Sequence, residues 1–234
     1  MTDLGDAFAT AFRLVAALDP DLVEIVLRSL YVSLTAVAIA AAVGLPLGAA
    51  LALLRFPGRG ALVVLFNALM GLPPVVAGLV FYLLLSRSGP LGGLGLLFTP
   101  AAMVVVQTAL ITPILVSLTR QVVEDLWREY EAQLRSLGSS AARAVPTLLW
   151  DGRFSLLTAL LAGFGRASAE VGAVLIVGGN IAAVTRTMTT AIALETSRGA
   201  LALALGLGII LIGLTLALNA AAYLAGRYAA ARAA

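Results

Sequence analysis

Long apolar segments separated by short polar ones run along the whole chain. Five are long enough to cross a bilayer as helices, which takes roughly 20 residues, and they lie at about 25–54, 61–85, 101–118, 154–177 and 201–225. An amphipathic stretch at 5–18 is too short to span and is expected to lie at the membrane interface. The pattern predicts an all-α membrane protein with five transmembrane helices, a short N-terminal interfacial helix and a single transmembrane domain over residues 1–234.

Prolines lie inside three of these segments, namely Pro46, the adjacent Pro73 and Pro74, and Pro113. Each proline removes a backbone donor and is expected to kink or break its helix. In a bilayer, such breaks are tolerated where neighbouring helices or a water-filled cavity satisfy the freed backbone groups. Simple kinking within a bundle explains any one of these sites, whereas several of them in one short chain favour a cavity of the kind that transporters use.

The fourth segment carries two opposite charges, Arg166 and Glu170, within an apolar run. A lone charge near a bilayer centre costs roughly 2.5–3.5 kcal/mol on insertion scales, and residues four apart on a helix can offset part of that cost by pairing. Asn180, Thr185 and Thr187 follow as hydrogen-bonding groups. Two interpretations stay open. Either these five residues line a pathway or gate, or the charges form a structural pair and the threonines cap a short outer helix.

Composition supports a membrane protein and argues against several functions. Hydrophobic residues make up 61% of the 234 residues and charged ones only 12%, too few for the polar shell of a soluble domain. The chain has no cysteine or histidine, which removes disulfides, thiol chemistry and the commonest metal ligand. Nothing resembles a nucleic-acid module, and no G-x-x-x-x-G-K-[ST] phosphate-binding loop occurs. We therefore expect neither nucleic-acid binding nor ATP hydrolysis by this chain.

The arginines are distributed unevenly between the two sides of the predicted bundle. More of them follow the first, third and fifth segments than lie in the connections on the other side, and none of the 15 basic residues is a lysine. By the positive-inside rule, the N-terminus is outside and the C-terminus is cytoplasmic. The same rule makes residues 119–153 a large cytoplasmic loop.

The 119–153 loop has the pattern of two short helices. Its apolar residues recur at helical spacing and form one stripe, which consists of Leu126, Tyr130, Leu134 and Leu137. Gly138 is expected to end the first helix, and Ser139 and Ser140 to start a second at about 141–149. Two ion pairs are expected at a spacing of four residues, Glu124–Arg128 and Glu131–Arg135. The stripe can dock on a partner or pack on the protein's own helices, and periodicity favours neither.

This loop resembles the coupling loop of ATP-binding-cassette (ABC) importer permeases, whose pattern is E-A-A, three residues, Gly, nine residues, I-x-L-P. With Gly138 aligned, the E-A-A positions hold Ala132, Gln133 and Leu134, and Leu137 precedes the glycine as usual. The chain departs from the pattern at two points. Glu131 stands one position before the expected glutamate, and Asp151 stands where the closing proline is usual.

Two further regions resemble the oxyanion branch of these permeases, and above all the tungstate type, which is related to the molybdate and sulfate ones. One region is the GLPPVVAG run at 71–78. The other begins at Gly165-Arg166-Ala167, continues through Glu170 and the Gly178-Gly179-Asn180 run, and ends in the apolar stretch up to residue 212. The resemblance covers nearly the whole chain from about residue 24.

The resemblance implies a type I ABC importer permease fold in which two copies of the chain form a pathway through the cytoplasmic (inner) membrane of a prokaryote. A cytoplasmic ABC ATPase dimer, which binds the ATP and Mg, would dock on a surface made of Glu131, Ala132, Arg135, Leu137 and Gly138. An extracytoplasmic binding protein would deliver the oxyanion. The permease itself would need no cofactor, and it would not be an enzyme.

Other functions stay open on the sequence alone. Molybdate or sulfate is the alternative substrate within the family, because the selecting pocket lies in another protein. An integral membrane enzyme, such as a lipid-modifying transferase, needs clustered polar residues at the interface, whereas the acidic residues here are scattered. A structural or assembly protein without transport has no need of broken spans and a charged fourth segment.

Overall fold

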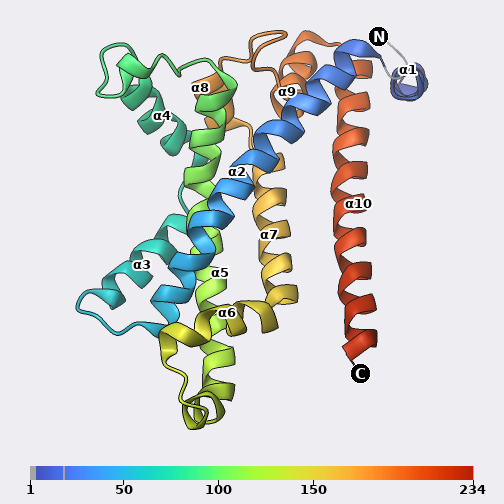
Figure 1. Cartoon of the computed structure of the whole chain (residues 1–234). Helices are drawn as coiled ribbons and strands as arrows, with labels where there is room; N and C mark the ends of the chain where they lie inside the picture. Colours follow the sequence, from blue (N-terminus) through green and yellow to red (C-terminus); the bar gives the residue numbers. More distant parts are fainter. Residues whose placement is uncertain (1–3, 18, 234) are drawn as a thin grey trace.

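The computed structural model describes residues 4–17 and 19–233, and every regular element in them is helical. This confirms the prediction of an all-α protein. Figure 1 shows the arrangement of the helices, whose bounds are α1 Leu4–Ala16, α2 Pro20–Leu53, α3 Arg59–Met70, α4 Pro74–Leu85, α5 Pro100–Ser136, α6 Ala141–Asp151, α7 Arg153–Ser168, α8 Gly172–Gly178, α9 Met188–Arg198 and α10 Leu201–Ala233, with a 3-10 turn η1 at Gly92–Leu94.

Three helices, α2, α5 and α10, are long and apolar enough to cross a membrane by themselves. Two more crossings are possible if each bent pair counts as one span: α3 with α4, and α7 with α8. The described helices therefore fit three to five spans. The five predicted segments correspond to these helices and pairs, but the second and fourth are not single helices.

The second predicted segment breaks in the middle, with a bend of 104° between α3 and α4. Pro73 is extended (φ −62°, ψ 125°), and Pro74 is the first residue of α4. Two successive prolines remove two backbone donors, and a residue before proline is disfavoured in the helical region. The predicted break at these two prolines is confirmed, and a single helix over 61–85 is wrong.

Pro46 and Pro113 do not break their helices, so of the kink or break expected at these two sites the break is not found. Helices α2 and α5 run through them for 34 and 37 residues. The two helices pack so closely that a Cβ added at Gly44 would lie 2.9 Å from the Cβ of Leu115. Dense packing along the rest of each helix offsets the one hydrogen bond that an interior proline removes.

Helix α5 does not end at residue 118 but continues unbroken to Ser136. The first half of the predicted 119–153 loop is therefore the projecting end of a long helix, and α6 follows it after a short turn. Gly138 has a φ of +76°, in the left-handed region that favours glycine at the end of a helix. The predicted stop at this glycine and the predicted second helix are both confirmed.

The core lies where α2 and α5 cross, at the centre of the molecule (Figure 1). Its fully buried members come from α2, α5 and α8 and include Val32, Met103, Val106, Leu115 and Val177. Two smaller clusters flank it: one joins the start of α2 to α9 and α10, and the other joins the end of α2 to α5 and α6. Helices α1, α8 and α9 lie at one end of the molecule, and α6 lies at the other (Figure 1).

The predicted interfacial segment at 5–18 is the helix α1, which packs on α10. Ala11 is fully buried, and its carbonyl oxygen would lie 3.6 Å from a Cβ added at Gly206. Residue 18 is outside the described residues. The location of α1 at a membrane surface stays a prediction.

Candidate functional site

Glu170 lies in the bend of 57° between α7 and α8, and its side chain is only 3% exposed. Both of its carboxylate oxygens have partners. One accepts from Nη1 of Arg166 at 2.7 Å, and the other accepts from the backbone N–H of Ala173 at 2.9 Å. The carboxylate therefore neutralises the arginine and satisfies a backbone donor in the first turn of α8. The predicted Arg166–Glu170 pair is confirmed.

The same bend is tied to two neighbouring helices. The hydroxyl of Thr189, in α9, donates to the carbonyl oxygen of Glu170 at 2.7 Å. From α5, Nε2 of Gln107 donates to the carbonyl oxygen of Ala167 at 3.1 Å, while Oε1 of Gln107 is buried without a hydrogen-bond partner. The bend is thus held on both sides by side chains that donate hydrogen bonds to backbone carbonyl groups of the interrupted helix.

Sequence reasoning missed Gln107 and Thr189 as members of this site. Gln107 is 3% exposed and lines a small internal space together with Arg166 and Glu170. The signal that could have found it is a single amide within the apolar run of the third predicted segment. A buried amide is expected to have a partner, so its presence in a transmembrane helix points to a broken neighbour.

The other predicted gate residues lie at the far end of α8, in the turn that leads to α9. The hydroxyl of Thr185 donates to the carbonyl oxygen of Gly178 at 2.5 Å and accepts from the N–H of Ile181 at 2.9 Å. Asn180 has a φ of +50°, and its Nδ2 donates to the carbonyl oxygen of Thr190 at 3.3 Å. These side chains stabilise the turn that they belong to.

Thr187 is the N-cap of α9, where it forms a reciprocal capping box with Thr190. This matches the prediction that a threonine caps a short outer helix. Thr185 and Thr187 are 1% and 6% exposed. The five predicted gate residues thus form two groups, one at each end of α8. Their hydrogen bonds account for a structural role, and a role in lining a pathway stays a prediction.

Helix α2 is also hydrogen-bonded to the turn that leads to α9 and to the start of α9. The hydroxyl of Ser29 accepts from the N–H of Met188 at 2.7 Å, and Nη2 of Arg28 donates to the carbonyl oxygen of Ala183 at 2.9 Å. Arg28 pairs with Glu24 one turn earlier. These two hydrogen bonds join the start of α2 to the start of α9 and to the turn before it.

At the opposite end of the molecule, the end of α5 and the helix α6 form an exposed surface. We call the predicted docking residues Glu131, Ala132, Arg135, Leu137 and Gly138 the coupling surface. Glu131 and Arg135 pair at 2.6 Å as predicted. Leu137 is 82% exposed.

Most of the apolar stripe of this region packs on the protein's own helices, which is one of the two predicted alternatives. Leu126, Tyr130 and Leu134 are partly buried. They pack on a cluster that contains Val123 of α5 and Leu148 of α6. These three residues attach α6 to α5, so they belong to the protein's own core. Leu137, the last residue of the stripe, is exposed, and its contact with a partner stays a prediction.

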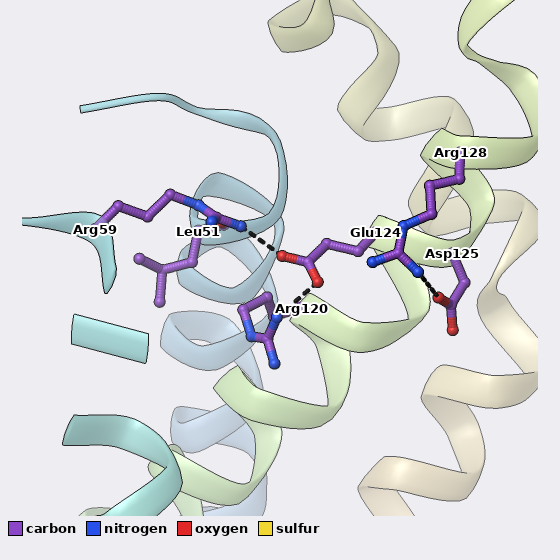
Figure 2. A network of polar contacts seen from close by, with 6 residues as sticks. All are labelled: Leu51, Arg59, Arg120, Glu124, Asp125 and Arg128. Atoms are coloured by element: carbon purple, nitrogen blue, oxygen red, sulfur yellow. Dashed lines mark hydrogen bonds and ion pairs between the residues drawn. The ribbon is translucent and has the colours of Figure 1, made fainter. Parts of the chain in front are cut away.

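Glu124 is the centre of a network that joins three elements (Figure 2). One of its oxygens pairs with Nη2 of Arg59, the first residue of α3, and the other accepts from Nη1 of Arg120 at 2.6 Å. The predicted Glu124–Arg128 pair is wrong, because both oxygens of Glu124 are taken by these two arginines. Arg128 pairs instead with Asp125 at 3.2 Å.

No protein-family model matches the sequence. The chain is 44% identical over 204 residues to a probable anion ABC transporter permease protein of Haloferax volcanii, covering 85% of this chain and 88% of the relative. It is 37% identical over 223 residues to the tungstate uptake system permease protein TupB of Peptoclostridium acidaminophilum, covering 95% and 98%. A sulfate transport system permease protein, CysW of Escherichia coli, is 30% identical over 188 residues, covering 75% and 63%.

Proposed function

Because the chain belongs to the anion and oxyanion branch of ABC transporter permeases, we propose that it is the membrane subunit of an importer for an oxyanion, most of all tungstate. The observation that carries this proposal is the alignment with a tungstate uptake permease, which extends over almost the full length of both chains. Molybdate and sulfate are the alternative substrates. The sulfate permease supports the second of these, over a smaller part of the chain.

ATP hydrolysis in this proposal belongs to a partner ATPase dimer, which also binds the ATP and Mg. The chain contains no G-x-x-x-x-G-K-[ST] loop. The coupling surface supports the docking of such a partner, because Leu137 exposes an apolar side chain beside the left-handed Gly138. The end of α5 and the helix α6 would then carry the movement of the ATPases into the bundle.

A second copy of the chain is proposed as the partner within the membrane. Helix α3 buries none of its residues completely, and valines and leucines of α3 and α4 are more than a third exposed, namely Leu62, Val64, Leu65, Val75, Val76, Leu79, Val80 and Leu83. The break between the two helices frees backbone groups that must not face lipid. A second copy that packs on this face would cover them and close a shared pathway, in a two-fold arrangement typical of homodimers.

The mechanism that we propose has two states. Closure of the ATPases brings the coupling surfaces of the two copies together and opens the cavity to the outside, where the binding protein releases the anion. Reopening after hydrolysis turns the cavity inward, and the bundle changes between these two packings as one cooperative unit. Arg166, which is 32% exposed, is the cation that the anion would meet at the bend between α7 and α8.

Uptake measurements in the cell test this function. Deletion of the gene for this chain is expected to lower the accumulation of tungstate, and the unsubstituted chain is expected to restore it. Molybdate and sulfate are measured in parallel. Loss of sulfate accumulation alone would make the sulfate alternative correct, and unchanged accumulation of all three anions would contradict the proposal.

Gly138→Arg tests the docking of the ATPases on the coupling surface. The variant is expected to insert normally but to lose anion-dependent stimulation of ATP hydrolysis, since an added Cβ meets nothing within the chain and the new side chain faces the partner. Gly199→Arg is the matched control, because Gly199 also has a positive φ (+79°), also lies in open space, and follows α9 at the opposite end of the molecule. Normal stimulation in Gly138→Arg would count against docking at this surface.

A further inference from the structure

The network around Glu124 connects parts of the chain that are far apart in sequence. Arg59 is 65 residues away from Glu124 and belongs to α3, whereas Arg120 is one turn earlier in α5. Figure 2 shows Arg59 reaching from the start of α3 to one oxygen of the carboxylate, while Arg120 reaches the other. A carboxylate shared by two guanidinium groups is held from two directions, which fixes its position more firmly than a single pair.

Arg59 also completes the end of α2. Its Nε donates to the carbonyl oxygen of Leu51 at 2.6 Å, in the last turn of that helix. Carbonyl groups in the last turn of a helix have no partner within it, so the guanidinium replaces a missing hydrogen bond. One arginine therefore joins the end of α2, the start of α3 and the carboxylate on α5.

Other contacts hold the start of α3 only loosely. The N-cap Gly58 forms no side-chain hydrogen bond, and α3 packs along α5 without burying a residue completely. The turn at 54–58 is exposed throughout. By contrast, the Glu124 and Arg120 side chains are only 18% and 15% exposed. The network is thus the specific anchor between α5 and the turn that leads into the bent α3–α4 pair.

We propose that Glu124 is a positioning residue that transmits movement from the coupling surface to the bent α3–α4 pair. Glu124 lies on α5 between the core of the bundle and the coupling surface, next to the cluster that attaches α6. When the partner ATPases displace the end of α5, the network carries the turn at 54–58 and the start of α3 with it. Without the carboxylate, the turn would stay behind and the movement would be lost. This proposal rests on the proposed function.

The positioning itself can be measured without any transport. The chain has no cysteine, so spin labels can be placed specifically at Arg55→Cys in the turn and Gln133→Cys near the end of α5, two exposed sites. The distance between the two spin labels is measured by pulsed electron paramagnetic resonance in lipid nanodiscs. Unlabelled chain is added in excess, so that the measured distances are those between two labels on the same chain. Glu124→Gln is expected to shift and broaden the distance distribution.

Asp125→Asn is the matched control. Asp125 is the next residue, it also pairs with an arginine, and both partners of that pair are 74% exposed. Removal of the Asp125 charge is expected to leave the distances between the labels unchanged. If Glu124→Gln also gives the distribution of the unsubstituted chain, Glu124 does not position the turn and the proposal is overturned.

The second measurement is the number of anions imported per ATP hydrolysed, in the complex reconstituted with its ATPase and binding protein. Glu124→Gln is expected to lower this ratio about fivefold, the effect of roughly one interaction of ordinary strength, while ATP hydrolysis continues. Glu124→Asp, which keeps the charge on a shorter side chain, is expected to recover part of the loss. An unchanged ratio in Glu124→Gln would overturn the transmission. Absence of import by the unsubstituted complex would instead contradict the proposed function and leave the label distances as the evidence on positioning.

Discussion

Glu170 and Glu124 are both glutamates whose two oxygens are occupied, yet they hold the molecule in different ways. The carboxylate of Glu170 accepts hydrogen bonds from Arg166 and Ala173, both within four residues of it. Glu124 contacts Arg120 one turn away and Arg59 across a gap of 65 residues. The first glutamate repairs a local break in a helix, and the second fixes one element against another. The difference teaches that the same residue type can complete one helix locally or connect two helices that are distant in sequence.

The sharpest test of the local role is Glu170→Ala. It leaves Arg166 partly buried without a counter-charge and an N–H of α8 without an acceptor, so we expect a destabilisation of about 3 kcal/mol. Thermal unfolding of the purified chain in detergent measures it. Glu170→Gln keeps an oxygen for the N–H of Ala173 and is expected to lose clearly less. Equal stability of all three proteins would show that the bend is held by packing and not by Glu170.

The double variant Arg166→Gln with Glu170→Gln separates structure from substrate contact. Each single variant leaves an unpaired polar group and is expected to lower anion import about tenfold, which corresponds to roughly 1.4 kcal/mol. The double variant removes both charges together and is expected to recover most of the import if the pair is structural. Import that stays low in the double variant would place Arg166 on the anion pathway.

Glu124→Ala is expected to cost less stability than Glu170→Ala, about 1 kcal/mol. The Glu124 side chain is 18% exposed, whereas that of Glu170 is 3% exposed and also accepts a hydrogen bond from a backbone N–H. Thermal unfolding under the same conditions checks this. A loss as large as that of Glu170→Ala would mean that the network is mainly a stabilising feature, and the contrast between the two glutamates would disappear.

Asp125→Asn gives the smallest effect in the series. Its pair with Arg128 is exposed on both sides, and such pairs contribute between zero and about 1 kcal/mol. We expect an unfolding temperature that cannot be distinguished from that of the unsubstituted chain. A clear loss would indicate that exposed charges near the end of α5 matter more than their burial suggests.

The sequence predicted the elements whose signals are local. Apolar length located the spans, Gly138 ended its helix as expected, and the spacing of Arg166 and Glu170 predicted their pair. Gly138 and the Arg166–Glu170 pair depend on residues close in sequence, so these two features could be predicted without knowing the fold.

The predictions that failed depend on contacts between distant segments. Pro46 and Pro113 are accommodated because α2 and α5 pack closely along their length, which no pattern within either helix reveals. Arg128 has the right spacing to pair with Glu124, but Arg59, which belongs to another helix, binds the carboxylate of Glu124 instead. Gln107 is recognised as part of the site only when the bend that it faces is known.

Helix α5 has 37 residues and no interruption, so it is about 55 Å long, well beyond the roughly 30 Å of a hydrocarbon core. Because the helix is continuous, the orientation of its projecting end is fixed relative to that of Gln107 near the bend of α7 and α8. A single residue inserted between these two regions would rotate one relative to the other by about 100°. The spacing between residues 107 and 124 therefore sets how the bend of α7 and α8 and the Glu124 network are rotated relative to each other. An insertion or deletion between them should impair transport more than most side-chain substitutions.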